Sequence, residues 1–266
     1  MTTVEVTSPS TDPATEPATP RFTIDPEIRP IPFSRLTRVE LRKMVDTRAG
    51  RALLTIVTAA TLATIVGTLI WGTGPHSLAG FLGATALPLS VLLPIIGIMG
   101  ATAEWSQRTG LVTFTLEPRR GRVVSAKLVA VVLLSLGVLA AALLAAAAAT
   151  LATGAAWDLT LPVLGGTVLA VLVFVLLGVA FGFAFLNTPV AIVASLVLPT
   201  IWTIVAGLVP SAMDAIGWLN INLTTMPLMS GEMTGTDWAK LGTSVLVWVG
   251  VPLAIGTRRV LTREVK

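Results

Sequence analysis

Long stretches of this sequence contain no Asp, Glu, Lys or Arg, and no other feature limits the possible folds so strongly. A helix needs about 20 consecutive apolar residues to cross a hydrocarbon core of ~30 Å. Hydrophobic residues make up 54% of the chain and charged residues only 12%, whereas soluble domains carry about a quarter charged residues. A membrane-spanning β-barrel would alternate apolar and polar residues with a period of two, but the run from Leu128 to Ala149 is apolar on nearly every face. The sequence therefore predicts an all-α membrane protein.

The uncharged stretches divide into six expected transmembrane helices. Their approximate bounds are 52–71, 78–103, 128–153, 161–186, 190–209 and 241–256. Only Asn187, Thr188 and Pro189 separate the fourth from the fifth, so we expect these two helices to form an antiparallel pair. The segment 211–240, between the fifth and sixth, is apolar around few charges. Two interpretations of it stay open, a hairpin that re-enters the membrane and an ordinary amphipathic loop.

The positions of the cations predict the orientation, because loops on the cytoplasmic side are rich in Lys and Arg. Six of these residues lie between Arg35 and Arg51, and five between Arg108 and Lys127. The opposite side holds only Lys240. We therefore expect both termini to be cytoplasmic, and an even number of spans satisfies this by placing both on the same side.

Two segments precede the first span. Residues 1–33 are rich in Pro and Thr and predict a disordered cytoplasmic tail. Residues 34–48 predict an amphipathic helix lying along the membrane interface, in which Thr37 and Glu40 have the spacing of a capping box. Its cations are Arg35, Arg38, Arg42 and Lys43. The alternative is a basic juxtamembrane segment without a helix.

The residue types available exclude most catalytic chemistry. The expected spans hold no ionisable residue, which disfavours proton-coupled transport. Gly-Lys never occurs, so the phosphate-binding loop of nucleotide hydrolases is absent. One His and no Cys offer neither a metal site nor a thiolate nucleophile. The net charge of +4 comes from cations that flank apolar spans, not from a basic face that would bind nucleic acid. We expect no enzyme activity and no cofactor or metal in this chain.

The loop 104–122 is the most informative segment. Glu104 and Arg108 are four residues apart, which favours an ion pair on one helical face. Leu111, Phe114 and Leu116 then form an apolar stretch, Pro118 is expected to end the helix, and a run of cations ends with Lys127. An apolar ridge with a basic rim suits docking onto another protein. The alternative is a basic loop that only sets the topology.

This loop resembles that of the type-2 ABC transporter permeases, which show Glu, then Gly-Thr-Leu, then Pro, Arg and Lys at similar spacings. The corresponding residues here are Glu104, Arg108, Thr109, Gly110, Leu111, Pro118, Arg120 and Lys127. The stretch RVELRKMVDTR ahead of the first span is similar to the connecting helix of that family. The resemblance covers residues 34–266, with two departures. Thr109-Gly110 inverts the usual order, and Asn187 stands where many members have a basic residue.

The resemblance implies that 34–266 is the permease domain of an ABC exporter. The loop would be a coupling helix seated in a separate ATPase subunit, and that subunit would carry ATP and Mg. Six spans would supply half of a pathway, completed by a second permease chain in a homodimer or related heterodimer. The uncharged spans favour an amphipathic or hydrophobic solute, such as a drug, lipid or peptide, and the lipid around them would be that of a bacterial inner membrane. The alternative function is a non-transporting anchor or scaffold for a cytoplasmic partner.

Overall fold

The computed structural model describes residues 31–73, 76–208 and 216–262, and these residues are almost entirely helical. The predicted tail lies outside the described residues except for its last three. Among the described residues there is no strand, only an isolated bridge between Ser77 and Ala156. The helices are α1 (Phe33–Asp46), α2 (Arg48–Trp71), α3 (Leu78–Ser106), α4 (Gly110–Leu116), α5 (Arg120–Thr153), α6 (Leu161–Phe185), α7 (Thr188–Leu208), α9 (Ile221–Ser230), α10 (Gly235–Val245), the π-helical turn η2 (Leu246–Gly250) and α11 (Val251–Thr262).

Within the described residues, six helical segments are long and apolar enough to cross a membrane. They are α2, α3, α5, α6, α7 and the continuous segment α10–η2–α11, and they coincide with the six expected spans. The helical class of the described residues and the number of candidate spanning helices are therefore as expected. Several helices extend further than expected. In particular, α5 begins at Arg120, eight residues before the expected start of the third span at Leu128.

The helices α3 and α6 form the centre of the bundle. In the most apolar part of each, 61% of the residues are buried, compared with 17% for α2 and α7. Glycines allow the two backbones to approach closely, because a Cβ atom at Gly178 would lie 2.7 Å from the carbonyl oxygen of Pro94. Gly182 faces Ala101 in the same way. The small residues of α6 therefore serve contact within the chain.

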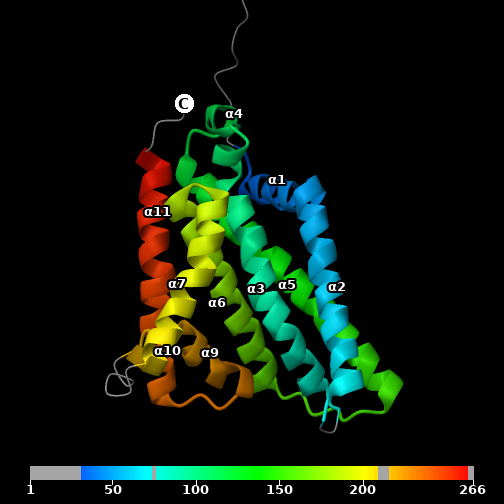
Figure 1. Ribbon diagram of the computed structural model, residues 1–266. Coiled ribbons are helices and arrows are strands. Elements are labelled where there is room, and N and C mark those ends of the chain that lie inside the picture. Colours follow the sequence, from blue (N-terminus) through cyan, green and yellow to red (C-terminus); the bar gives the residue numbers. More distant parts are fainter. Residues whose placement is uncertain (1–30, 74–75, 209–215, 263–266) are drawn as a thin grey trace, which may run out of the picture. The chain divides into compact units, whose positions relative to one another are not determined.

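The bundle has two distinct ends, seen in Figure 1. At the first, which we call the α1 end, α1 packs across α2, α3 and α5, and α4 lies beside it. Arg259 of α11 reaches the carbonyl oxygen of Ala184 at this end. At the opposite end, which we call the α9 end, α9 packs against α6, and the backbone N–H of Leu78 donates to the carbonyl oxygen of Ala156. The connections α2–α3 and α5–α6 thus meet at the α9 end.

The segment 211–240 begins in residues outside the description, and its described part returns into the bundle. Trp202 of α7 and Trp248 of η2 donate their indole N–H groups to the carbonyl oxygens of Ile216 and Leu219, at 3.2 and 2.6 Å. Asn220 then caps α9 by accepting from two backbone N–H groups. Since Trp248 lies midway along the sixth segment, α9 starts beside that midpoint and runs toward the α9 end. This geometry favours the re-entrant hypothesis, which stays a prediction.

Candidate functional site

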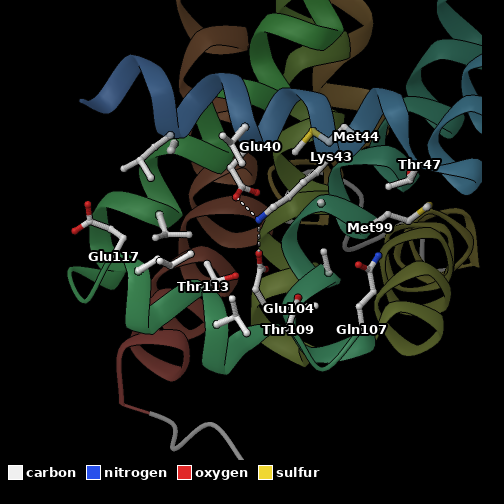
Figure 2. Close-up of a pocket in the computed structure, with 18 of the residues that line it drawn as sticks. Glu40, Lys43, Met44, Thr47, Met99, Glu104, Gln107, Thr109, Thr113 and Glu117 are labelled. Atoms are coloured by element: carbon white, nitrogen blue, oxygen red, sulfur yellow. Dashed lines mark hydrogen bonds and ion pairs between the residues drawn. The ribbon is translucent and has the colours of Figure 1, made fainter. Parts of the chain in front are cut away.

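Four charged side chains meet at the α1 end and form what we call the ionic cluster. Glu40 and Lys43 come from α1, Glu104 from α3 and Lys127 from α5. Lys127 Nζ lies 2.6 Å from Glu40 Oε2, 2.9 Å from Glu104 Oε1 and 2.9 Å from the carbonyl oxygen of Gly100. Lys43 Nζ lies 2.6 Å from Glu40 Oε1 and 3.3 Å from Glu104 Oε1 (Figure 2). The cluster thus joins three helices by charge-assisted hydrogen bonds.

Three of the four members of the ionic cluster are buried. Glu40 is 4% exposed, and Glu104 and Lys127 are each 2% exposed. A buried ion is stable only when a partner and further hydrogen bonds replace its hydration, and Lys127 meets this condition with three acceptors. Lys43 reaches the cluster from the rim. Burial alone would lower the pKa of its ammonium group, but the charges and hydrogen bonds of Glu40 and Glu104 outweigh burial and raise that pKa above its ordinary value of 10.5.

The sequence pattern of α1 explains how Glu40 reaches the cluster. Thr37, Glu40 and Met44 recur at helical spacing and form the buried face of α1. Arg35, Arg38 and Arg42 lie exposed, as their predicted shared face requires. The predicted capping box is wrong, because α1 begins at Phe33. Thr37 is therefore inside the helix and donates to the carbonyl oxygen of Phe33.

The predicted ion pair between Glu104 and Arg108 is also wrong. α3 ends at Ser106, and Arg108 has a positive φ of 56° and an exposed side chain. Glu104 is still inside the helix and points instead at the lysines. The sequence placed Lys127 at the end of the loop. Because α5 begins at Arg120, Lys127 lies inside that helix instead. The two charges that the sequence assigned to a docking loop are therefore internal to the bundle.

The short helix α4 carries the exposed apolar residues of this region. Leu111 is 64% exposed, Val112 61% and Leu116 69%. The predicted ridge also included Phe114, but this ring is half-buried and packs against Trp105 and under the guanidinium of Arg120, 4.7 Å from the ring centroid. The exposed apolar set is thus Leu111, Val112 and Leu116, of which Val112 was missed.

The segments around α4 are tied to the bundle. Thr109, exposed at the start of α4, donates its backbone N–H to the carbonyl oxygen of Glu104, and Gly110 is buried. After α4, which ends before Pro118 as expected, the buried Glu117 pairs with Arg122 at 2.8 Å. Arg122 also donates to the carbonyl oxygen of Ile31 at 2.6 Å. Arg120 donates to the carbonyl oxygen of Val260 in α11 at 3.0 Å.

A cavity of about 480 Å³ lies between α1, α3, α4 and α5 (Figure 2). Its lining is mainly apolar and includes Leu36, Met44, Met99, Ala103, Val112 and Val123. Glu40, Lys43 and Glu104 also line it, so the ionic cluster forms part of its wall. Glu104 Oε2 is buried and has no hydrogen-bond partner among the described residues. The region therefore combines an exposed helix, a buried ionic cluster and a cavity with one unsatisfied acceptor.

Comparison of the chain with known protein families finds no matching family model, and comparison with curated proteins finds no match. The relation to type-2 ABC permeases therefore stays a prediction, based on the motif residues and on six spanning helices. No group of three or more metal-binding side chains occurs in the part of the chain that the structure describes.

Proposed function

We propose that this chain is the permease subunit of an ATP-driven exporter, powered by a separate ATPase that docks on α4. The observation that carries the proposal is the ionic cluster directly behind α4, where buried charges join α1, α3 and α5. α4 is connected to α3 through residues 107–109 and to α5 through residues 117–119. A displacement of α4 would therefore act on two spanning helices that the cluster links to α1.

The exposed surface of α4 fits a protein partner. Leu111 and Leu116 expose apolar surface at a loop where no hydrocarbon is expected to cover it. Exposed apolar residues surrounded by polar ones mark interaction sites, and the cations Arg108 and Arg119 beside them favour an acidic rim on the partner. ATP and Mg would be held by that partner, in keeping with the absence of a phosphate-binding loop here.

The distribution of charge supports a cytoplasmic α1 end. The cations of α1, of the residues that flank α4 and of the start of α5 gather there, whereas Lys240 of α10 lies toward the α9 end together with Asp158, Glu232 and Asp237. In this orientation α1 turns Arg35, Arg38 and Arg42 toward the anionic headgroups of the inner leaflet. This distribution supports the proposal that both termini are cytoplasmic, and a bacterial inner membrane is part of the same proposal.

The uncharged spans favour a hydrophobic or amphipathic solute, and a second permease chain, identical or related, would complete the pathway.

A scaffold that anchors a cytoplasmic protein without transport is the second candidate, and the same exposed α4 surface supports it. The two differ in consequence. An exporter couples binding at α4 to movement of a solute, whereas a scaffold only holds its partner.

The docking of α4 can be tested with two matched changes on one helix. The double substitution Leu111→Ser/Leu116→Ser removes exposed apolar surface, and Thr115→Ser is the control on the same helix. We expect the double variant to bind an ATPase encoded by a neighbouring gene at least about tenfold more weakly. Each leucine that docking buries contributes roughly 1.5–3 kcal/mol to the free energy of binding. Thr115→Ser should bind as the wild type does.

ATP-dependent uptake of a hydrophobic dye into inside-out vesicles then separates the two candidates. Uptake that fails together with binding supports the exporter. Binding without any uptake supports the scaffold, and equal binding by all three proteins would show that α4 is not the docking surface.

A further inference from the structure

We propose that the cavity under α1 binds a neutral amphiphile, an aliphatic molecule with a single hydroxyl group. The hydroxyl would donate to Glu104, and the aliphatic part would lie against α1, α3 and α4. The proposal can be tested apart from the proposed docking of an ATPase, because its binding reaction needs only this chain. The volume and the lining of the cavity, the unsatisfied acceptor of Glu104 and the balance of charges around the site support this proposal.

The cavity has the dimensions of a ligand site. Its volume of about 480 Å³ falls within the roughly 300–1,000 Å³ typical of small-molecule pockets, which are mostly apolar with a few placed polar groups. Methionines at 44 and 99 form part of the wall, and their flexible side chains adapt to varied aliphatic shapes. The cavity therefore favours an aliphatic body over a highly polar one.

Glu104 supplies the polar contact. Its Oε1 atom accepts from both Lys43 and Lys127, while its Oε2 atom is buried and accepts from no described residue. Leaving such an acceptor unsatisfied is costly, roughly as costly as losing a hydrogen bond to a charged group. A ligand that brings one O–H donor would satisfy it without disturbing the lysines, whose contacts use the other oxygen.

The charge balance selects a neutral ligand. In the ionic cluster two carboxylates meet two ammonium groups, so their formal charges cancel. Of the other charged residues in the lining, Glu117 is paired with Arg122, and Arg35 is exposed to solvent. A cation or an anion would bring an unbalanced charge into an enclosed site, which costs free energy. A neutral hydroxyl brings none.

The entrance lies between α1 and α4. Val39 of α1 and Val112 and Leu116 of α4 line the cavity while remaining exposed, so an aliphatic chain can enter along them. Leu111 does not line the cavity, although it neighbours Val112 on α4. A substitution at Leu111 therefore tests docking without changing the cavity lining. A substitution at Ala103, on the α3 wall, changes the cavity and leaves the exposed surface of α4 intact.

The test measures binding of tritiated dodecanol to the full chain in phosphatidylcholine nanodiscs. Competitors with the same chain are dodecyl methyl ether, which has no donor, dodecylamine and dodecanoate. We expect dodecanol to compete at least about tenfold better than the ether, the size expected for a hydrogen bond to a charged group, and better than either charged analogue. Equal competition by the ether would overturn the contact with Glu104, and stronger binding of the amine would overturn the charge argument.

Two variants locate the site. Glu104→Gln presents an N–H donor in place of the unsatisfied oxygen, so the ether should then compete as well as the alcohol. Ala103→Phe should abolish specific binding by filling the cavity, whereas Leu111→Ser should leave it unchanged. Unaltered binding to Ala103→Phe, or an unaltered preference in Glu104→Gln, would refute the proposal. Diacylglycerol added to the nanodiscs distinguishes a membrane-derived occupant, which displaces the probe, from a soluble one, which does not.

Discussion

A buried lysine is stable only if nearby acceptors replace its lost hydration, and Lys127 shows how this chain meets that requirement. Its ammonium group bonds to Glu40, Glu104 and the carbonyl oxygen of Gly100. Each of these acceptors belongs to α1 or α3, so a single side chain of α5 joins three helices. The ionic cluster is thus more specific than an apolar contact, because its hydrogen bonds form only when the three helices are placed so that Lys127 reaches both carboxylates.

Lys127→Met should destabilise the protein by about 3–5 kcal/mol, because it leaves Glu40 and Glu104 short of a buried partner. Thermal unfolding in detergent, followed by tryptophan fluorescence, measures the effect. Arg38→Met, at an exposed position on α1, is the control and should change little. Adding Glu40→Gln and Glu104→Gln to Lys127→Met should recover much of the loss, since the uncompensated charges are then gone. A triple variant no more stable than Lys127→Met would contradict this account.

At the scale of elements, close approach between helices depends on a few glycines of α6. Gly178 and Gly182 face α3, whereas Gly166 faces the backbone of α9 at Leu228. The neighbouring Gly165 has no atom within 4 Å of where a Cβ would stand. Two adjacent glycines in one helix thus have different structural roles. Of the two, only Gly166 is needed for the packing of α9 against α6.

Gly166→Ala and Gly165→Ala should therefore change stability in opposite directions. At Gly166 the added methyl group would overlap the carbonyl oxygen of Leu228, and a backbone atom cannot move aside alone, so we expect a loss of roughly 1–3 kcal/mol. At Gly165 the alanine meets open space and raises helix propensity by about 0.5–1 kcal/mol. Thermal unfolding of both variants under one condition decides the matter. A similar loss in both would mean that α9 does not sit against Gly166.

At the scale of the whole molecule, the described helices separate charge from apolar surface. Cations and the ionic cluster gather at the α1 end, and the flanks of α2 and α7 expose mainly apolar side chains. This separation matches the environments that a membrane offers along its normal. The orientation proposed for the chain follows from it.

The orientation predicts which positions a membrane-impermeant maleimide reaches in intact cells. The chain contains no cysteine, so Leu111→Cys and Trp157→Cys each introduce a single reactive thiol. Both positions are exposed, the first on α4 at the α1 end and the second between α5 and α6 at the α9 end. Trp157→Cys should be labelled in intact cells, and Leu111→Cys only in inside-out vesicles. The reverse pattern would place the α1 end outside the cell.

The sequence by itself determined the class of protein and its six spans, because an uncharged run of sufficient length is a local property. It also indicated the exposed face of α1 and the end of α4 before Pro118. It did not identify the partners of Glu104. Helical spacing favours Arg108, but α3 ends before that residue, and Lys127 becomes available only because α5 begins early.

Only the tertiary structure decided which charges are buried together and where the cavity lies. Glu40 and Lys127 are 87 residues apart in the chain, and no local pattern links them. Their proximity results from α1 packing across α3 and α5. The uncharged runs that first defined the chain therefore specify the spans, while the few charges beside them specify how one end of the bundle is assembled, since a buried ion must be matched by a particular partner and an apolar side chain need not be.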